Sequence, residues 1–332
     1  MRQAAQSLLE HRQILILCHQ DPDGDTLGSG FALCEALRGL GKSVKVLCDS
    51  FPPQFSFLYP KAPSQALTQP FVVAVDVADE RLLGERLRRY AGNVDLCIDH
   101  HPSNTLYARQ TLLEPQAAAT AEILVRLLDV MGVPLTKRIA AGLYTGISTD
   151  TGCFKFSNTT AQLHRTAARL METGIDTYRI NRRMFDIKSK GRIAIERMVL
   201  DTVRYYYGGT CALIYITQEM VEKAGATQSE LGTLSSLPRQ IEGVEIGVTL
   251  RQRGDSFKVS VHTGGALDAA ALCAKLGGGG HFRAAGCVIR APLPQAVRTL
   301  VELIGLELAR VHSPLAGQSS PKRIPSGPKL LD

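Results

Sequence analysis

The chain has 332 residues, a formal net charge of +7 at pH 7 and a sequence pI near 9.0. No apolar stretch approaches the roughly 18–20 residues that span a bilayer, and the first residues lack the apolar region and cleavage site of a signal peptide. The eight cysteines are scattered without a CxxC pair, which favours buried thiols in a reducing compartment. These features argue against a membrane-embedded or secreted protein and predict a cytoplasmic one.

The positive charge has two interpretations. It can serve solubility alone, or it can attract an anionic substrate. Part of it belongs to residues 313–332, a segment rich in Pro, Ser and Gly that carries Lys322, Arg323 and Lys329 and is predicted to be a disordered tail.

The first half of the chain alternates strand and helix patterns. Apolar runs at 14–18, 43–48, 71–75 and 94–98 predict buried strands, with a helix at 26–40 after the first. This rhythm predicts an α/β domain built on a doubly wound, mainly parallel sheet. From residue 117 the pattern is helical, with helices expected at 117–131, 136–147, 160–173 and 176–185.

The second half predicts a smaller α/β domain. Strand-like segments at 210–216, 241–250, 257–262 and 287–289 alternate with helical ones at 219–224, 229–237, 268–275 and 294–309. A charged helix at 189–207 is expected to connect the two domains. The predicted organisation is therefore 1–187, a connector at 188–207, a second domain at 208–312, and the tail.

Acidic and histidine residues follow the apolar runs of the first domain. His19, Asp23 and Asp25 come after the first run, Asp76 after the third, and Asp99-His100-His101 after the fourth, while Asp150 lies in a polar Ser-Thr-Asp-Thr-Gly segment. Ligands of parallel sheets bind outside the carboxyl ends of the strands, so these residues are expected to meet. Taken singly, each has an ordinary alternative: Asp25 capping the next helix, Asp76 a strand-end residue, Asp150 a turn residue.

Their chemistry points to a metal-dependent hydrolase. The set of four carboxylates and two neutral imidazoles matches two divalent cations: His19, Asp23, Asp25, Asp76, His100 and Asp150. Carboxylate-rich sites without thiolate suit manganese or magnesium, with zinc or cobalt as alternatives. Two such ions activate water and polarise a phosphoryl group, so phosphoester hydrolysis is predicted.

The second domain contains a glycine-rich segment at 276–286. Gly278, Gly279 and Gly280 allow close approach of backbone to a ligand and can offer amides to an anion, while His281 and Arg283 add phosphate donors. The alternative is a flexible connector before the last strand. No GxGxxG motif follows the first strand, which argues against a nicotinamide site.

Together these motifs closely resemble the DHH phosphoesterase superfamily, named after the Asp99-His100-His101 triplet. The similarity covers about residues 10–310 in family order. The glycine-rich segment, with His281 and Ala285-Gly286, is similar to the DHH-associated C-terminal domain of the nanoRNase/pAp-phosphatase branch.

The resemblance assigns residue roles. It implies one Mn²⁺ on His19, Asp23 and Asp76 and a second on Asp25, Asp76, His100 and Asp150, with Asp76 bridging. It also implies that His101 contacts the scissile phosphate, that Asp99 orients the histidines, and that Arg251, Lys258, His262, His281 and Arg283 grip the nucleotide. His262 departs from the pattern, because many relatives carry an arginine there, which puts the substrate length preference in doubt.

The implied function is hydrolysis of short single-stranded oligoribonucleotides and 3′-phosphoadenosine 5′-phosphate in a cleft between the domains. The expected cofactor is two Mn²⁺ per chain, with Mg²⁺ or Co²⁺ as alternatives. No membrane partner is expected, and a homodimer is compatible with the resemblance. Alternative functions are a phosphodiesterase for linear or cyclic dinucleotides, a RecJ-like exonuclease, a manganese pyrophosphatase, and a nucleotide-binding regulator without activity.

Overall fold

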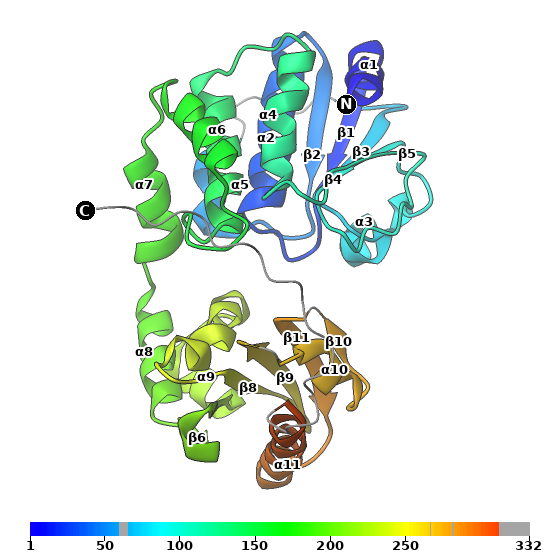
Figure 1. Cartoon of the computed structure of the whole chain (residues 1–332). Coiled ribbons are helices and arrows are strands. Elements are labelled where there is room, and N and C mark those ends of the chain that lie inside the picture. The colour runs from blue at the N-terminus through cyan, green and yellow to red at the C-terminus, as the bar shows by residue number, and fades with distance from the viewer. Residues whose placement is uncertain (60–65, 266, 281, 312–332) are drawn as a thin grey trace, which may run out of the picture. The chain divides into compact units, whose positions relative to one another are not determined.

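The computed structural model describes residues 1–59, 66–265, 267–280 and 282–311, and divides the chain into two compact units. The first unit is Met1–Ile187 and the second is Lys188–Asp332 (Figure 1). Among the described residues, no helix combines the length and the apolar character needed to cross a membrane.

The first unit is built on a five-stranded, wholly parallel sheet with the strand order β2-β1-β3-β4-β5. Its strands are β1 (Gln13–Leu17), β2 (Ser43–Leu47), β3 (Phe71–Val75), β4 (Leu96–Asp99) and β5 (Gln110–Leu113). The prediction of a doubly wound parallel sheet is confirmed. Strand β5 was not predicted, because its Gln-Thr-Leu-Leu sequence is only partly apolar and lies at the sheet edge.

Both faces of this sheet are covered, which explains the continuous apolar runs. Ile14 and Ile16 pack with α1 (Arg2–Glu10), α2 (Gly24–Gly39), α4 (Thr120–Val130) and α5 (Lys137–Asp150), whereas Leu15 and Leu17 face a shorter segment with η2 (Glu80–Leu83) and α3 (Gly84–Leu87). The other helical segments are η1 (Pro53–Leu58), η3 (Arg88–Tyr90), α6 (Ala161–Met171), α7 (Thr177–Asn181) and η4 (Arg182–Asp186).

The second unit contains a mixed sheet with the order β10-β11-β9-β8-β7-β6, in which only β7 and β8 are parallel neighbours. The strands are β6 (Arg204–Tyr206), β7 (Cys211–Ile216), β8 (Ile246–Arg253), β9 (Ser256–Thr263), β10 (Gly279–Gly280) and β11 (Ala284–Ile289), with the turn η5 (Tyr207–Gly209) after β6.

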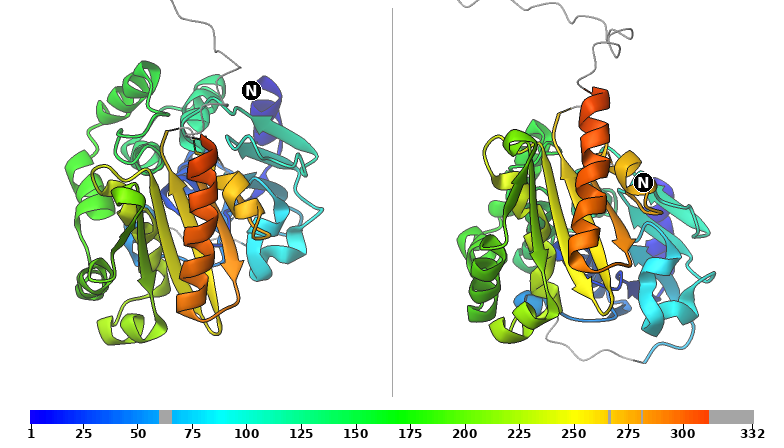
Figure 2. Two further views of the ribbon diagram at one scale, coloured as in Figure 1. Left: turned by 60° about the horizontal axis from the view of Figure 1, so that its bottom comes forward. Right: turned by 90° about the horizontal axis from the view of Figure 1, so that it is seen from below.

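Helices cover both faces of this sheet as well. One face packs against α8 (Lys190–Leu200), α9 (Gln218–Ala224) and η6 (Gln228–Gln240), and the other against α10 (Ala269–Ala274) and α11 (Leu293–Val311). Figure 2 shows α11 lying along the strands. The helix predicted at 189–207 is wrong beyond Leu200, because residues 204–206 pair with β7 instead. Ile195 and Val199 of α8 pack against β7, so this helix is part of the second unit's core.

Candidate metal centre

Three neighbouring strands deliver polar residues to one edge of the first sheet. His19 lies two residues beyond β1, Asp76 directly follows β3, and His100 directly follows β4. The order β2-β1-β3 places β1 at the point where the chain reverses its direction of winding, so a crevice is expected outside the ends of β1 and β3. The distances between their side chains confirm that these residues lie close together.

The start of α2 adds two carboxylates with different roles. Asp23 is the N-cap, and its Oδ1 accepts hydrogen bonds from the amides of Asp25 and Thr26 at 3.0 and 3.1 Å. Asp25 does not cap its own helix. Its buried carboxylate instead accepts the amides of Thr120 and Ala121, at 2.6 and 2.9 Å, at the start of α4.

The last residue of α5 is Asp150, so this helix extends three residues beyond the predicted helix at 136–147. Its Oδ2 lies 3.3 Å from Nε2 of His100. Helices α2 and α5 approach each other closely at Gly28 and Gly142: a Cβ added to Gly28 would lie 2.3 Å from the carbonyl oxygen of Gly142. This contact brings the helix that carries Asp25 close to the helix that ends at Asp150.

Asp76 is buried at the centre of the group and uses its two oxygens differently. Oδ2 lies 3.7 Å from Nε2 of His19, and Oδ1 lies 3.5 Å from Nε2 of His100. Thr120 Oγ1 donates a hydrogen bond to Oδ1 at 3.0 Å. The backbone of Asp76 is left-handed, with φ 61°, a conformation that is uncommon outside glycine and is found at functional sites.

These contacts define one carboxylate–histidine cluster, within which three sets of ligand atoms each lie within 4.8 Å of one another. The sets are His19, Asp23 and Asp76; Asp25, His100 and Asp150; and Asp76, His100 and His101. All six predicted metal ligands therefore occur in this cluster.

In each histidine of the Asp99-His100-His101 triplet, the ring nitrogen Nδ1 is held by a hydrogen bond. His100 Nδ1 lies 3.1 Å from the carbonyl oxygen of Ala117, which can only accept, so this nitrogen carries the proton. In the neutral ring, Nε2 of His100 then carries the lone pair, and this atom is buried without a hydrogen-bond partner among the described residues. A buried imidazole nitrogen oriented in this way among carboxylates suits a metal ligand.

Asp99 is fully buried and fixes the orientation of the two histidines that follow it. Its Oδ1 accepts hydrogen bonds from the amide of His100 at 2.8 Å and from Nδ1 of His101 at 2.7 Å. Asn104 Nδ2 donates to its Oδ2 at 2.6 Å. Burial raises the pKa of Asp99, but the hydrogen bonds from His101 and Asn104 outweigh it and lower the pKa overall. Asn104 was not predicted, because its only signal in the sequence is its position shortly after the triplet.

The cluster concentrates negative charge away from water. Burial, followed by the charge of Asp150, raises the pKa of Asp25 to about 7. Burial and the charge of Asp25 raise the pKa of Asp76 well above its usual value. Burial disfavours the protonated form of His100, yet Asp150 and Asp25 raise its pKa to about 9. Carboxylates that repel one another in this way would be stabilised by cations.

The predicted substrate residues of the second unit fall into two groups. Arg251 and Lys258 are directly opposite each other on β8 and β9. His262 lies four residues beyond Lys258 on β9, and alternate residues of a strand point to the same side, so all three share one face of the sheet. Burial lowers the pKa of His262, and the nearby Arg239 lowers it further. Arg283 lies apart from this face, with Nη1 donating to the carbonyl oxygen of Gly265 at 2.6 Å.

The glycine-rich segment has a structural role that its sequence pattern did not predict. Gly279 and Gly280 form β10, and a Cβ on Gly278 would lie 2.2 Å from the carbonyl oxygen of Gly286. The amides of Gly277 and Gly278 bond to carbonyls at the end of α10, so these two amides are not free to bind an anion. His281 lies outside the described residues.

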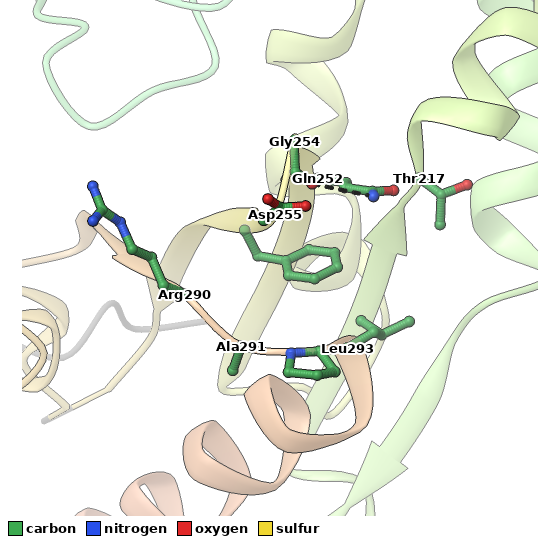
Figure 3. A pocket seen from close by; sticks show the side chains of 9 residues that line it. Thr217, Gln252, Gly254, Asp255, Arg290, Ala291 and Leu293 are labelled. Carbon is green, nitrogen blue, oxygen red and sulfur yellow. Dashed lines mark hydrogen bonds between the residues drawn. The ribbon is translucent and has the colours of Figure 1, made fainter.

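A depression of about 620 Å³ lies on the second unit where the β8–β9 hairpin meets the start of α11 (Figure 3). It is lined by Thr217, Gln252, Gly254, Asp255, Phe257, Arg290, Ala291, Pro292 and Leu293. It contains no histidine or cysteine and only one carboxylate, so it lacks the ligand set of a metal centre.

Sequence comparisons agree with this architecture. The DHH family N-terminal domain matches residues 13–147, and the DHHA1 domain matches residues 210–309. The chain is 35% identical over 307 residues to the bifunctional oligoribonuclease and PAP phosphatase NrnA of Thermus thermophilus, covering 90% of each chain. It is 27% identical to the NrnA of Bacillus subtilis, covering 83% of this chain and 89% of that protein.

Solved structures show the same fold. An exopolyphosphatase-related protein from Bacteroides fragilis superposes with a TM-score of 0.82 at 24% identity, covering 92% of this chain and 96% of the other. RecJ of Thermus thermophilus in complex with Mn²⁺ superposes with a TM-score of 0.54 at 16% identity, covering 92% of this chain and 54% of that one. With its DHH triplet, its DHHA1 domain and its similarity to the NrnA proteins, the chain belongs to the DHH phosphoesterase family.

Proposed function

We propose that this hydrolase uses two divalent metal ions, with Mn²⁺ preferred, to cleave short oligoribonucleotides and to remove a phosphate from 3′-phosphoadenosine 5′-phosphate. The observation that carries the proposal is the convergence of four carboxylates and two histidines at the edge of the first sheet. The substrate class is supported by the NrnA relatives, which are named bifunctional oligoribonucleases and PAP phosphatases and which the chain matches over most of its length.

In this proposal His19 and Asp23 would hold one ion, and Asp25, His100 and Asp150 would hold the other. Asp76 would supply one oxygen to each ion, because its two oxygens face different histidines. The donor set fits hard divalent ions, since it contains carboxylate oxygens and imidazole nitrogens but no thiolate. When bound, such ions lower the pKa of water and stabilise charge on a phosphoryl group.

Among the protein's own residues, the Asp99-His101 pair would contact the phosphate and transfer a proton. Asp99 accepts the proton on Nδ1 of His101, so in the protonated ring the other nitrogen would donate to a phosphate oxygen or pass its proton to the leaving oxygen, which would leave the ring neutral. The buried carboxylate of Asp99 would stabilise the charged ring before it gives up this proton. The face that carries the cations Arg251 and Lys258, with the imidazole of His262, would bind the rest of the nucleotide.

The test is turnover of a substrate panel by the full chain reconstituted with Mn²⁺. The panel contains 3′-phosphoadenosine 5′-phosphate, RNA dinucleotides, linear pApA and longer RNA. We expect hydrolysis of the first two classes, with the activity lost when the metal is chelated. The Asp76→Ala variant, purified in the same way, controls for a contaminating nuclease. A folded, metal-loaded protein that cleaves none of the panel would refute the proposed function.

A further inference from the structure

A strained turn directly follows Asp150. Gly152, Cys153 and Phe154 are consecutive left-handed residues, with φ of 54°, 60° and 63°. This conformation is unfavourable for residues with a Cβ, and most so for bulky ones such as Phe154. The turn is held by backbone hydrogen bonds, including Cys153 N to the carbonyl oxygen of Ser148 at 2.7 Å. Strain of this kind persists where the surrounding structure fixes it, and it is typical of ligand-binding segments.

The far end of the same loop is tied back to the carboxylate–histidine cluster. Asn158 Nδ2 donates to the carbonyl oxygens of Asp150, at 3.1 Å, and of Ala118, at 3.2 Å. Ala118 adjoins Ala117, which orients His100. The loop 151–158 therefore starts and ends beside two of the proposed metal ligands.

The turn directs its two aromatic rings to different environments. Phe154 is partly buried and stacks on His164, with ring centroids 5.2 Å apart. Phe156 is 58% exposed, and a Cβ on Gly152 would lie 2.4 Å from its Cζ, so its ring rests against bare backbone. Lys155 between them is exposed. The loop thus presents a supported aromatic ring and a neighbouring cation to solvent.

We propose that Phe156 is a stacking surface for a nucleobase of the substrate and that Lys155 pairs with a neighbouring phosphate. The inference rests on the proposed nucleotide substrate and adds the subsite that holds the base. A ring fixed in place by its loop binds a base without paying for its own ordering. Stacking uses the π-face that every base possesses, so this contact favours nucleotides without selecting a sequence.

The absence of tryptophan from the chain allows a direct binding test. The Phe156→Trp variant would carry the chain's single tryptophan at the proposed surface, and its emission can be excited selectively over that of the nine tyrosines. We expect AMP to quench its fluorescence and ribose 5-phosphate to have no effect, because only AMP carries a base. The matched control is Tyr178→Trp, since Tyr178 is 72% exposed on α7 outside the loop. Absence of quenching, while calorimetry shows that AMP binds the same variant, would overturn the proposal.

Kinetics separate stacking from a structural role of the ring. Phe156→Ala should lower kcat/KM for an RNA dinucleotide about 5- to 150-fold, mainly through KM. Phe156→Ala should leave turnover unchanged for an analogue of this dinucleotide that has the same backbone but no bases. Lys155→Met should raise KM for the dinucleotide and for the analogue. Equal losses in Phe156→Ala on both substrates would overturn the stacking role. If the wild-type chain hydrolyses no nucleotide, the proposed function fails, and the fluorescence test still decides whether the ring binds a base.

Discussion

The candidate residues of the two units are held in different ways. In the first unit, Asp25 and Asp76 are buried and accept hydrogen bonds from the start of α4, which fixes their direction. In the second unit, Lys258 and Arg283 are exposed, and the Arg283 guanidinium donates to a loop carbonyl and lies over the ring of its neighbour Phe282.

This difference matches what each group is proposed to bind. A metal ion requires ligands within a few tenths of an ångström of ideal positions, so its residues must be held before it binds. A phosphate can be reached by long flexible cations from several directions. Substitutions in the first unit should therefore abolish activity, and substitutions in the second should reduce it by degrees.

The largest effect is expected for Asp76→Ala. Removal of the proposed bridging carboxylate should release both metals and lower kcat/KM by at least about a thousandfold, because several kcal/mol of charge stabilisation are lost. Elemental analysis and turnover measure the two effects. Asp21→Ala is the matched control, since Asp21 is exposed in the same strand-end segment and belongs to none of the ligand sets. Full metal occupancy in Asp76→Ala would contradict the bridge.

A smaller loss is expected for Asn104→Ala. Without its hydrogen bond to Asp99, the buried carboxylate and the His101 ring should lose their fixed orientation, lowering kcat about 10- to 100-fold with KM and metal content unchanged. Steady-state kinetics with metal analysis provide the test. Asn93→Ala, which removes an exposed amide bonded only to its neighbour Ala91 at 3.4 Å, should behave like wild type. A rise in KM at constant kcat would show that Asn104 serves substrate binding instead.

A graded effect is expected for Arg283→Ala in the second unit. Loss of one exposed, charge-assisted contact should raise KM for a dinucleotide about tenfold and leave kcat and metal content intact. Arg310→Ala removes an exposed arginine of α11 and should change neither constant. A large fall in kcat for Arg283→Ala would place this residue in the chemistry and remove the distinction between the units.

The last effect concerns stability rather than turnover. A metal that binds only the folded first unit should stabilise it by about 2.7 kcal/mol at a concentration one hundred times Kd. Calorimetry of metal-loaded and chelator-treated protein should show the first unit's transition shifted upwards and the second unit's unchanged. An equal shift of both transitions would mean that the two units unfold together.

The sequence predicted well those features that depend on local pattern. The apolar runs located β1 to β4, since strands covered on both faces leave little ambiguity. All six residues expected to gather did so, because the carboxyl ends of parallel strands share an edge. The triplet Asp99-His100-His101 and the glycine-rich segment led to the family.

Features that the local apolar pattern does not encode were missed. Strand β6 pairs with β7 although its Arg-Tyr-Tyr sequence continues a helical pattern. Asp150 ends a helix because α5 is longer than its apolar periodicity suggested. The role of Thr120 depends on a hydrogen bond to Asp76, which is 44 residues away, and no local signal announces it.

The contact between Gly28 and Gly142 has a practical consequence. Replacing helical glycines by alanine is a common way to make a protein more heat-resistant, since it reduces the freedom of the unfolded chain. Here a methyl group on Gly142 would lie 2.7 Å from the carbonyl oxygen of Gly28, so α2 and α5 would have to separate. Their carboxylates would move with them. Efforts to engineer a robust reagent from this chain should leave both positions untouched and should screen variants for turnover as well as for melting temperature.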